Sequence, residues 1–352
     1  MSFVHVNNVR MVGTTVCVPS QIENNLDYEG IPIAERESFI QSIGIEHRRV
    51  APTDVCTSDL CEQAARHLLQ KLAWDLYEVD ILIFVSQTPD YKMPATSCVL
   101  QNRLGLSTDC MTIDISQGCS GWVYGLSVIG SLLSQGSLKK GLLLVGNTQS
   151  KNINYRDKSI YPLFSDAGSA TAFEYCSLGG DSYNLLFKTD GSGENTIIIP
   201  DGGYRNPVSP SSFIEQEYTG GIRRSPLNIK MQGDDVFAFV AGNVPKATKE
   251  LFEKFNVNPE EIDYYLLHHA SKFICDKLIR KLSIPNNKAP LQLKDFGNCS
   301  NASIPLLLCT SIRDEVLNRE LNLYISGFGV GLSMGVGIIS ISKLKCADFI
   351  EF

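Results

Sequence analysis

The stretch DISQGCSGWVYGL, Asp114 to Leu126, constrains the fold of this chain more than any other. It ends an expected strand, turns on small residues and starts a helix with Cys119 in its first turn. From Ile115 to Leu138 no residue is charged, and apolar side chains occur all around the expected helix, a pattern typical of a helix buried on all sides. We exclude a membrane span, because the helical part is shorter than the roughly 20 residues that a bilayer requires and contains several Gly and Ser residues.

Cys119 is the candidate nucleophile of this stretch. A thiol at the N-terminus of a buried helix faces unpaired N–H groups and the positive end of the helix dipole, so we expect its pKa to fall. Gly118 and Gly121 let the backbone turn sharply and let a carbonyl group approach main-chain donors, as in other nucleophile elbows. The alternative is a small packed residue of the core, which is the usual role of a cysteine.

The composition limits the class of protein, its cellular location and its possible partners. The chain has 352 residues, of which 43% are hydrophobic and 20% charged, as expected for a globular protein of one large domain or two smaller ones. The first residues lack a basic region followed by an apolar run, and no segment is long and apolar enough to span a bilayer, so we expect a cytoplasmic protein without a membrane partner. The net charge of −7 and the lack of a basic, aromatic-rich segment argue against nucleic acid.

The eleven cysteines are expected to be reduced thiols. Their number is odd, they are scattered and they form no CxxC pair; Cys56 and Cys61 lie too far from any second pair for a zinc site. His67 is interpreted as a packed or surface histidine rather than a ligand. We therefore expect no metal.

Strands and helices alternate through the first half of the sequence. The expected strands are residues 4–18 with a break at Gly13, 79–85, 110–115, 141–147 and the end of 163–175; the expected helices precede Gly44 and cover 57–72 and 95–104. This alternation predicts an α/β fold with a mostly parallel sheet covered on both faces. Residues 201–228, rich in Gly, Pro and Ser, are interpreted as a functional loop near a site mouth or at a subunit contact.

The second half of the chain repeats the first in outline. EVDILIFVSQTPD resembles EIDYYLLHHASKF, MTIDISQGCSG resembles QLKDFGNCSNA, and GLLLVGN resembles LNLYISGFG. Three matches in the same order indicate an internal duplication with halves 1–176 and 177–352. The second match predicts a strand, a turn and a helix start around Asn298. We therefore expect a site shared between the halves.

His268 and Asn298 complete a constellation with Cys119. His268 follows the expected strand 264–267, at the end where open α/β sheets place their sites, and Asn298 lies at the turn equivalent to that of Cys119. A cysteine hydrolase uses the same residue types, with His as the base for the thiol, so these three residues alone do not choose the reaction. A dry, helix-buried cysteine favours an acyl thioester that is protected from water.

The chain resembles the β-ketoacyl-acyl-carrier-protein synthase III family, condensing enzymes of the thiolase superfamily, along nearly its whole length. The family's motifs occur in order as GIEHRRVA, QTPDYKMPATSCVLQNRLGL, DISQGCSGWVYGL, LFSDAGSA, MQGDDVF, LLHHASKF, FGNCSNASIP and GFGVGLSMG. The resemblance implies a thiolase-like α/β fold, internally duplicated in αβαβα layers with buried central helices. It also implies a homodimer without a metal or redox cofactor.

The reaction that the resemblance implies has two stages. Cys119 takes an acyl group from a thioester of coenzyme A or acyl carrier protein; malonyl-acyl carrier protein then loses CO2, and its enolate attacks the acyl-cysteine to give a 3-oxoacyl product. His268 and Asn298 would donate hydrogen bonds to the malonyl thioester oxygen, which requires a neutral His268 that presents an N–H. The backbone N–H groups of Cys119 and Val330 would form a second oxyanion hole at the acyl-enzyme carbonyl.

Two neighbours of these residues are assigned no role in the site. The family usually has Gln where this chain has His269, and adjacent side chains of a strand point to opposite faces, so only His268 is assigned to the site. Cys299 is interpreted as a small packed residue.

Departures from the family concern the substrates. A Trp and an Arg that flank the adenine of coenzyme A in the family correspond to Ser38 and Ser42, so we expect weaker docking of coenzyme A. Met93 replaces a Phe that reaches across the dimer to the partner's acyl pocket, which allows a primer other than acetyl. Arg280 and Lys281 match a basic patch for acidic acyl carrier protein, with a solvated helix face as the alternative.

The sequence is also compatible with two other functions. A non-decarboxylating acyltransferase on the same fold would move the Cys119-bound acyl group to an alcohol or an amine. A catalytically silent, carrier-binding subunit is the third hypothesis, and the presence of Cys119, His268 and Asn298 argues against it.

Overall fold

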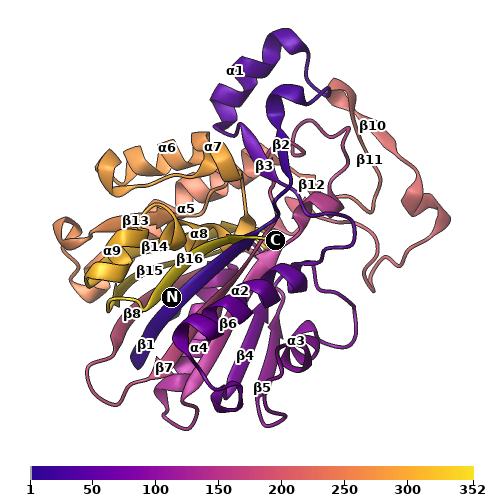
Figure 1. Ribbon diagram of the computed structural model, residues 1–352. Coiled ribbons are helices and arrows are strands. Elements are labelled where there is room, and N and C mark those ends of the chain that lie inside the picture. Colours follow the sequence, from indigo (N-terminus) through magenta and orange to yellow (C-terminus); the bar gives the residue numbers. More distant parts are fainter. Residues whose placement is uncertain (1) are drawn as a thin grey trace.

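A ten-stranded mixed β-sheet forms the centre of the computed structural model, which describes residues 2–352 (Figure 1). The strand order is β13-β14-β15-β8-β1-β7-β6-β4-β5, and β16 pairs with β1. The strands are β1 (Ser2–Val18), β4 (Ile81–Val85), β5 (Met111–Ile115), β6 (Lys140–Asn147), β7 (Ala167–Tyr175), β8 (Asp181–Thr189), β13 (Tyr264–Leu267), β14 (Leu321–Gly329), β15 (Ser333–Ile341) and β16 (Cys346–Glu351). Three short pairs lie outside this sheet: β2 (Ile22–Asn24) with β3 (His47–Arg49), β9 (Ile197–Ile198) with β12 (Lys230–Met231), and β10 (Gln216–Tyr218) with β11 (Ile222–Arg224).

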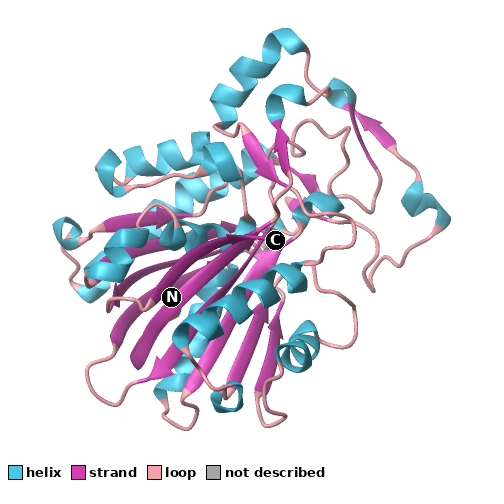
Figure 2. Cartoon of the chain, in the orientation of Figure 1, coloured by secondary structure: helices cyan, strands magenta, loops and turns pink. Residues whose placement is uncertain are grey.

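The described residues form nine α-helices. They are α1 (Ile33–Ile43), α2 (Thr57–Leu72), α3 (Thr96–Leu104), α4 (Gly121–Ser134), α5 (Gly233–Phe255), α6 (Lys272–Lys281), α7 (Leu293–Phe296), α8 (Ser303–Cys309) and α9 (Arg313–Asn318). Several of these helices pack on the faces of the sheet, whereas α1 lies apart from it (Figure 2). The expected helices before Gly44, at 57–72 and at 95–104 are thereby confirmed to within a residue or two. The expected break at Gly13 is a register shift of β1 against β7.

The sheet is mixed rather than mostly parallel, which corrects the sequence-based expectation. The pairs β4–β5, β4–β6, β13–β14 and β1–β16 are parallel, whereas β1, β6, β7, β8, β14 and β15 form antiparallel pairs with one another. Parallel neighbours require a crossover, usually through a helix, but antiparallel neighbours can follow each other through short turns. The link from β14 to β15 is such a turn, and β6 and β7 are antiparallel neighbours joined without an α-helix. The strands β7 and β8 do not pair with each other, because β1 lies between them.

Both proposed halves contribute to this one sheet in mirrored order. On one side of the centre the order is β4-β6-β7-β1, and on the other it is β13-β14-β15-β8. The expected strand in QLKDFGN does not form, since this segment is the short helix α7. Its residue Leu293 packs with Ile45 and Cys275, which lie outside the sheet. That local packing decides the structure of the segment, and the β4–β5 pair has no counterpart beside β13.

Three apolar clusters separate the helices and the sheet into layers. The central cluster contains α4 and α8 side chains together with strands of both halves. Residues of α2 and α3 pack against β4 and β6 in a second cluster, and α5 and α6 pack against β13, β14 and β15 in a third. The two sides of this one sheet, β4-β6-β7-β1 and β13-β14-β15-β8, enclose α4 and α8 between them, with α2 and α3 outside the first side and α5 and α6 outside the second. This confirms the layered arrangement with buried central helices. Within residues 2–352, no helix combines the length and the apolar character needed to cross a membrane.

The central layer makes a prediction about stability. Leu126 of α4 is fully buried in the central cluster, so Leu126→Ala removes apolar contacts and leaves a cavity that costs about 2–5 kcal/mol of unfolding free energy. Urea unfolding measures this loss. Leu178→Ala, at a side chain that is 86% exposed, is the matched control and is expected to stay within about 0.5 kcal/mol of the parent. Equal effects of the two substitutions would contradict the central position of α4.

Candidate active site

Cys119 lies just before α4, where the two proposed halves meet. The helix begins at Gly121 with Ser120 as its N-cap, so the expectation that the cysteine lies in the first turn is wrong by two residues. Strand β14 of the other half approaches it closely. A Cβ atom added to Gly329 would lie 2.8 Å from Cys119 Sγ, and one added to Gly327 would lie 2.9 Å from the Cys119 carbonyl oxygen. Glycine at both positions is therefore a condition for this contact.

The expected fall of the Cys119 pKa is wrong. Burial raises the pKa of this thiol, and the three donors that face the sulfur, namely the Ser300 hydroxyl and the backbone N–H groups of Val330 and Cys119, lower it by less. Ser300 Oγ lies 3.9 Å from Cys119 Sγ. Because the sulfur is densely surrounded by protein, the loss of solvation outweighs the donors. Cys119 retains part of its surface accessible, so a substrate can reach it.

His268 is buried at the end of β13 and is uncharged. Its backbone N–H donates to the Ser326 carbonyl group at 2.8 Å, which continues the pairing of β13 with β14. Its ring meets the Phe328 ring edge to face, with centroids 5.3 Å apart. Burial lowers the pKa of His268 to about 3, and the neighbouring His269 adds to this effect. The imidazole is thus neutral near pH 7, as a hydrogen-bond donor to an oxyanion requires.

The hydroxyl group of Ser303 controls the tautomer of His268. Ser303 Oγ lies 2.8 Å from the Ser300 carbonyl oxygen and 3.2 Å from His268 Nδ1. A hydroxyl group carries one hydrogen and a carbonyl oxygen can only accept, so the contact with Ser300 uses that hydrogen and Ser303 Oγ accepts from His268 Nδ1–H. Donation from His268 Nε2 to a substrate oxygen therefore requires the Ser303 hydroxyl to turn toward Nδ1, which moves the ring proton to Nε2. Ser303 has no distinguishing signal in the sequence, because only its proximity to His268 reveals its role.

Asn298 is held by its backbone and its side chain. Its backbone N–H donates to the Leu163 carbonyl group at 2.9 Å, and its carbonyl group accepts from Ser165 N at 3.0 Å. Its Oδ1 accepts from the Ser300 backbone N–H at 2.9 Å, and Nδ2 lies 3.4 Å from the Ala270 carbonyl oxygen. One carboxamide N–H therefore remains for a ligand.

Ser300 connects the three residues that the sequence singled out. Its hydroxyl faces Cys119, its N–H holds Asn298, and its carbonyl group binds Ser303, the partner of His268. Ser300 was not among the predicted site residues, although its position in FGNCSNASIP, two residues after Asn298, is a signal. We call Cys119, His268, Asn298, Ser300 and Ser303 the Ser300 cluster.

Two buried carboxamides fix the Ser300 cluster from behind. Asn147 Nδ2 donates to Asn301 Oδ1 at 3.0 Å and lies 3.2 Å from Ser300 Oγ. Asn301 Nδ2 donates to the Val85 carbonyl group at 3.0 Å. Both side chains are buried. Each hydrogen bond therefore pairs an amide group that would destabilise the folded state if it were buried without a partner. Neither residue could be assigned from its sequence position, because they lie in different halves.

Val330, the other expected oxyanion residue, lies in the turn between β14 and β15. Ser333 Oγ donates to the Val330 carbonyl group at 2.9 Å and lies 2.9 Å from Ser120 Oγ. These contacts fasten the turn of one half to the start of α4 in the other. The two backbone N–H groups that face the Cys119 sulfur are thereby held on opposite sides of the junction between the halves.

His269 and Cys299 point away from the Ser300 cluster. His269 Nε2 accepts from the Gln292 backbone N–H at 3.5 Å, and burial lowers the pKa of this ring to about 4. Cys299 Sγ donates to the Phe296 carbonyl group at 3.2 Å and packs in a separate apolar cluster.

The residues expected to select substrates and partners lie at the surface. Ser38 and Ser42 line a cavity of about 460 Å³ along α1, together with Phe39 and Lys158. Met93 is 78% exposed before α3.

The other expected surface positions lie on α6 and in the 201–228 loop. Arg280 and Lys281 are exposed in the last turn of α6. The 201–228 loop borders a second cavity, of about 530 Å³, whose lining includes Gln87. Gln87 also adjoins Gly118, the residue before Cys119.

Comparison with known proteins places the chain in a family. Models of the 3-oxoacyl-[acyl-carrier-protein] synthase III family match residues 113–191 and, for its C-terminal part, residues 252–341. The β-ketoacyl-[acyl-carrier-protein] synthase III of Lactococcus lactis is 31% identical over 92% of this chain and 96% of its own length. That of Clostridium perfringens is 29% identical over 96% of this chain and 100% of its own length.

A solved structure agrees with these sequence relatives. The 3-oxoacyl-(acyl-carrier protein) synthase of Burkholderia xenovorans is 34% identical, covers 100% of this chain and 99% of its own, and superposes with a TM-score of 0.93. The layered fold and the half-buried cysteine before the central helix α4 are those of the thiolase-like class of condensing enzymes. Within that class, the chain belongs to the β-ketoacyl-acyl-carrier-protein synthase III family.

The close contact at Gly329 makes a prediction about Cys119. Gly329→Ala places a methyl group against the sulfur and in the way of a reagent. If the overpacking of about 1–3 kcal/mol adds to the barrier for reaction at the sulfur, the rate of Cys119 alkylation falls by roughly 5- to 150-fold. Mass spectrometry of the Cys119 peptide after iodoacetamide treatment measures this rate. Gly191→Ala, where nothing lies within 4 Å of the new Cβ, is the control. An unchanged rate in Gly329→Ala would disprove the contact.

The two buried histidines make a prediction about acid stability. Burial lowers the pKa of His268 to about 3 and of His269 to about 4, so between about pH 6.5 and pH 4 the unfolded chain binds protons that the folded protein does not. Stability therefore falls as the pH falls, by about 1.4 kcal/mol per pH unit for each ring. His269→Gln is expected to remove one such contribution in urea unfolding measured across this range. The exposed His5→Gln serves as control, and identical slopes for His269→Gln and wild type would contradict the burial of a neutral ring.

Proposed function

We propose that this protein catalyses the decarboxylative condensation of an acyl thioester with malonyl-acyl carrier protein, to give a 3-oxoacyl-acyl carrier protein. The observation that carries the proposal is the Ser300 cluster, in which a thiol faces one side of Ser300 while two uncharged N–H donors, on His268 and Asn298, are fixed from the other side. Family membership supports the same reaction.

In the first stage, Cys119 becomes acylated. Its sulfur attacks the thioester carbonyl carbon, and the carrier thiol leaves with the proton that the Cys119 thiol has lost. The negative charge that develops on the carbonyl oxygen is stabilised by the backbone N–H groups of Cys119 and Val330, which already face the sulfur. Donors fixed before the reaction stabilise such a charge without reorganisation. The raised pKa of the free thiol means that these donors act chiefly in the transition state.

In the second stage, the malonyl thioester loses CO2. The electron pair of the broken C–C bond moves toward the thioester oxygen, where His268 Nε2–H and Asn298 Nδ2–H donate hydrogen bonds. The carbanion carbon then attacks the acyl carbonyl carbon, the C–S bond to Cys119 breaks, and the thiolate regains a proton. A positively charged imidazole would be costly at this buried position, so His268 acts as a neutral donor. Ser303 is a positioning residue for it.

Substrates and partners are proposed from surface residues. Arg280 and Lys281 form a basic site at the end of α6 for acidic acyl carrier protein. Ser38 and Ser42 offer no ring or guanidinium to hold an adenine, which favours acyl groups delivered on carrier protein. Met93, exposed before α3, would line the acyl pocket of a second copy in a homodimer. The reaction requires no cofactor beyond its thioester substrates, and location in the cytoplasm stays a prediction.

The proposal is tested by following both stages in one preparation. Incubation with acyl-coenzyme A or acyl-acyl carrier protein is expected to add one acyl mass to the wild-type protein and to Cys299→Ala, whereas Cys119→Ala stays unmodified. Addition of malonyl-acyl carrier protein is then expected to release CO2 and form the 3-oxoacyl product, detected by mass spectrometry. Transfer of the acyl group to an alcohol or an amine without release of CO2 would refute the proposal.

A further inference from the structure

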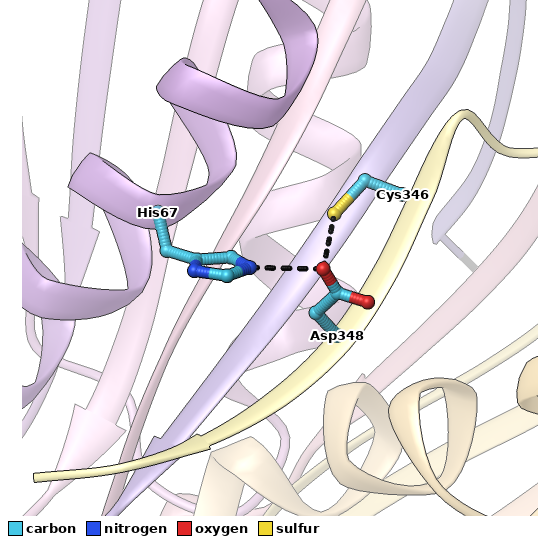
Figure 3. A group of neighbouring side chains, drawn as sticks. All are labelled: His67, Cys346 and Asp348. Atoms are coloured by element: carbon cyan, nitrogen blue, oxygen red, sulfur yellow. Dashed lines mark hydrogen bonds and ion pairs between the residues drawn. The ribbon is translucent and has the colours of Figure 1, made fainter.

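A second group of reactive side chains lies outside the Ser300 cluster, between α2 and β16 (Figure 3). His67 Nε2 lies 2.8 Å from Asp348 Oδ2, and Cys346 Sγ lies 3.5 Å from the same oxygen. The three potential ligand atoms all lie within 4.8 Å of one another. The proposed condensation uses none of them.

The fold brings these residues together although 281 positions separate His67 from Asp348. Cys346 and Asp348 are two residues apart on β16, so their side chains point to the same face of the strand. β16 pairs in parallel with β1, which places Cys346 opposite Gly13. A Cβ added to Gly13 would lie 3.0 Å from Leu68 Cδ1 and 3.3 Å from Cys346 Cβ, so glycine lets α2, with His67, approach β16.

We propose that His67, Cys346 and Asp348 bind a divalent transition-metal ion of the zinc type. An imidazole nitrogen, a thiolate and a carboxylate oxygen are the donors that zinc prefers. Metal bonds of about 2.0–2.3 Å in a tetrahedron set the ligand atoms roughly 3.3–3.7 Å apart, so the present separations require only small side-chain movements. Three protein ligands leave the fourth position for water or a small anion.

The neighbouring charges fit such a site. Arg313 Nη2 binds the other carboxylate oxygen of Asp348, Oδ1, at 3.1 Å, and so orients Oδ2 toward His67 as an outer partner of a metal ligand would. Lys71 Nζ lies 3.9 Å from Oδ2, but its side chain is 56% exposed and can turn into solvent. The thiolate and the carboxylate together supply two negative charges for a divalent ion.

The site can be reached from solvent. The side chains of His67 and Asp348 are 28% and 18% exposed, respectively, while Cys346 is buried beneath them. An ion therefore enters past His67 and meets the sulfur last. A simple ion pair between His67 and Asp348 is the competing explanation, and it does not require Cys346.

Cobalt(II) binding distinguishes the two explanations. The full-length, reduced Cys119→Ala protein, which lacks the active-site thiol, is titrated with CoCl2 and then with ZnCl2. We expect one cobalt ion per chain, with the thiolate-to-cobalt charge-transfer band and the visible bands of a tetrahedral site, both displaced by zinc. Cys346→Ser is expected to abolish the charge-transfer band, and Asp348→Asn or His67→Gln to weaken binding by about 10-fold or more. Cys98→Ser, at an exposed thiol, is the matched control and keeps the band.

Two results would overturn the proposal. One is the lack of a charge-transfer band at saturating cobalt, and the other is a band of unchanged intensity in Cys346→Ser. Circular dichroism identifies variants that keep the parent fold. If Cys346→Ser loses the parent fold, the cobalt affinities of His67→Gln and Asp348→Asn test the site instead. Undiminished cobalt affinity in either of these two variants also refutes the proposal.

Discussion

The whole arrangement depends on the close contact between β14 and the turn that carries Cys119. Gly327 and Gly329 bring the backbone of one half against the sulfur and carbonyl group of the other. Because of this contact, the Val330 N–H reaches the sulfur, and α4 can lie between the layers of the sheet. Packing in the central layer thus determines the chemistry, since a shift of α4 would move the nucleophile away from its donors.

Burial acts on the two key side chains in complementary ways. It raises the pKa of Cys119 and lowers that of His268 to about 3, so both groups are uncharged before a substrate binds. A dry site of neutral groups strengthens each hydrogen bond to a developing negative charge. The polar side chains needed to hold such a site, among them Asn147 and Asn301, are satisfied by one another across the junction. The same water-poor environment protects an acyl-cysteine from hydrolysis.

The sequence predicted the layered fold, the elements of the first half and the residues that meet around Ser300. The elements were predicted from local periodicity, whereas the layered fold rests on ordered motifs that resemble those of a known family. Three features were not predictable, since each depends on contacts between distant segments. They are the mixture of parallel and antiparallel strand pairs, the helical state of residues 293–296 and the raised pKa of Cys119. For the same reason Ser300, Ser303 and the His67 group became visible only in the structure.

The central claim is that Cys119 with its own backbone donors performs acylation, while His268 and Asn298 serve only the malonyl thioester. Stopped-flow measurement of the two stages in His268→Ala and Asn298→Ala tests it most directly. The account predicts that each substitution leaves the rate of Cys119 acylation nearly unchanged and lowers malonyl decarboxylation by about 10²- to 10³-fold. An equal loss in both stages would contradict it, because these side chains would then act on the thiol itself.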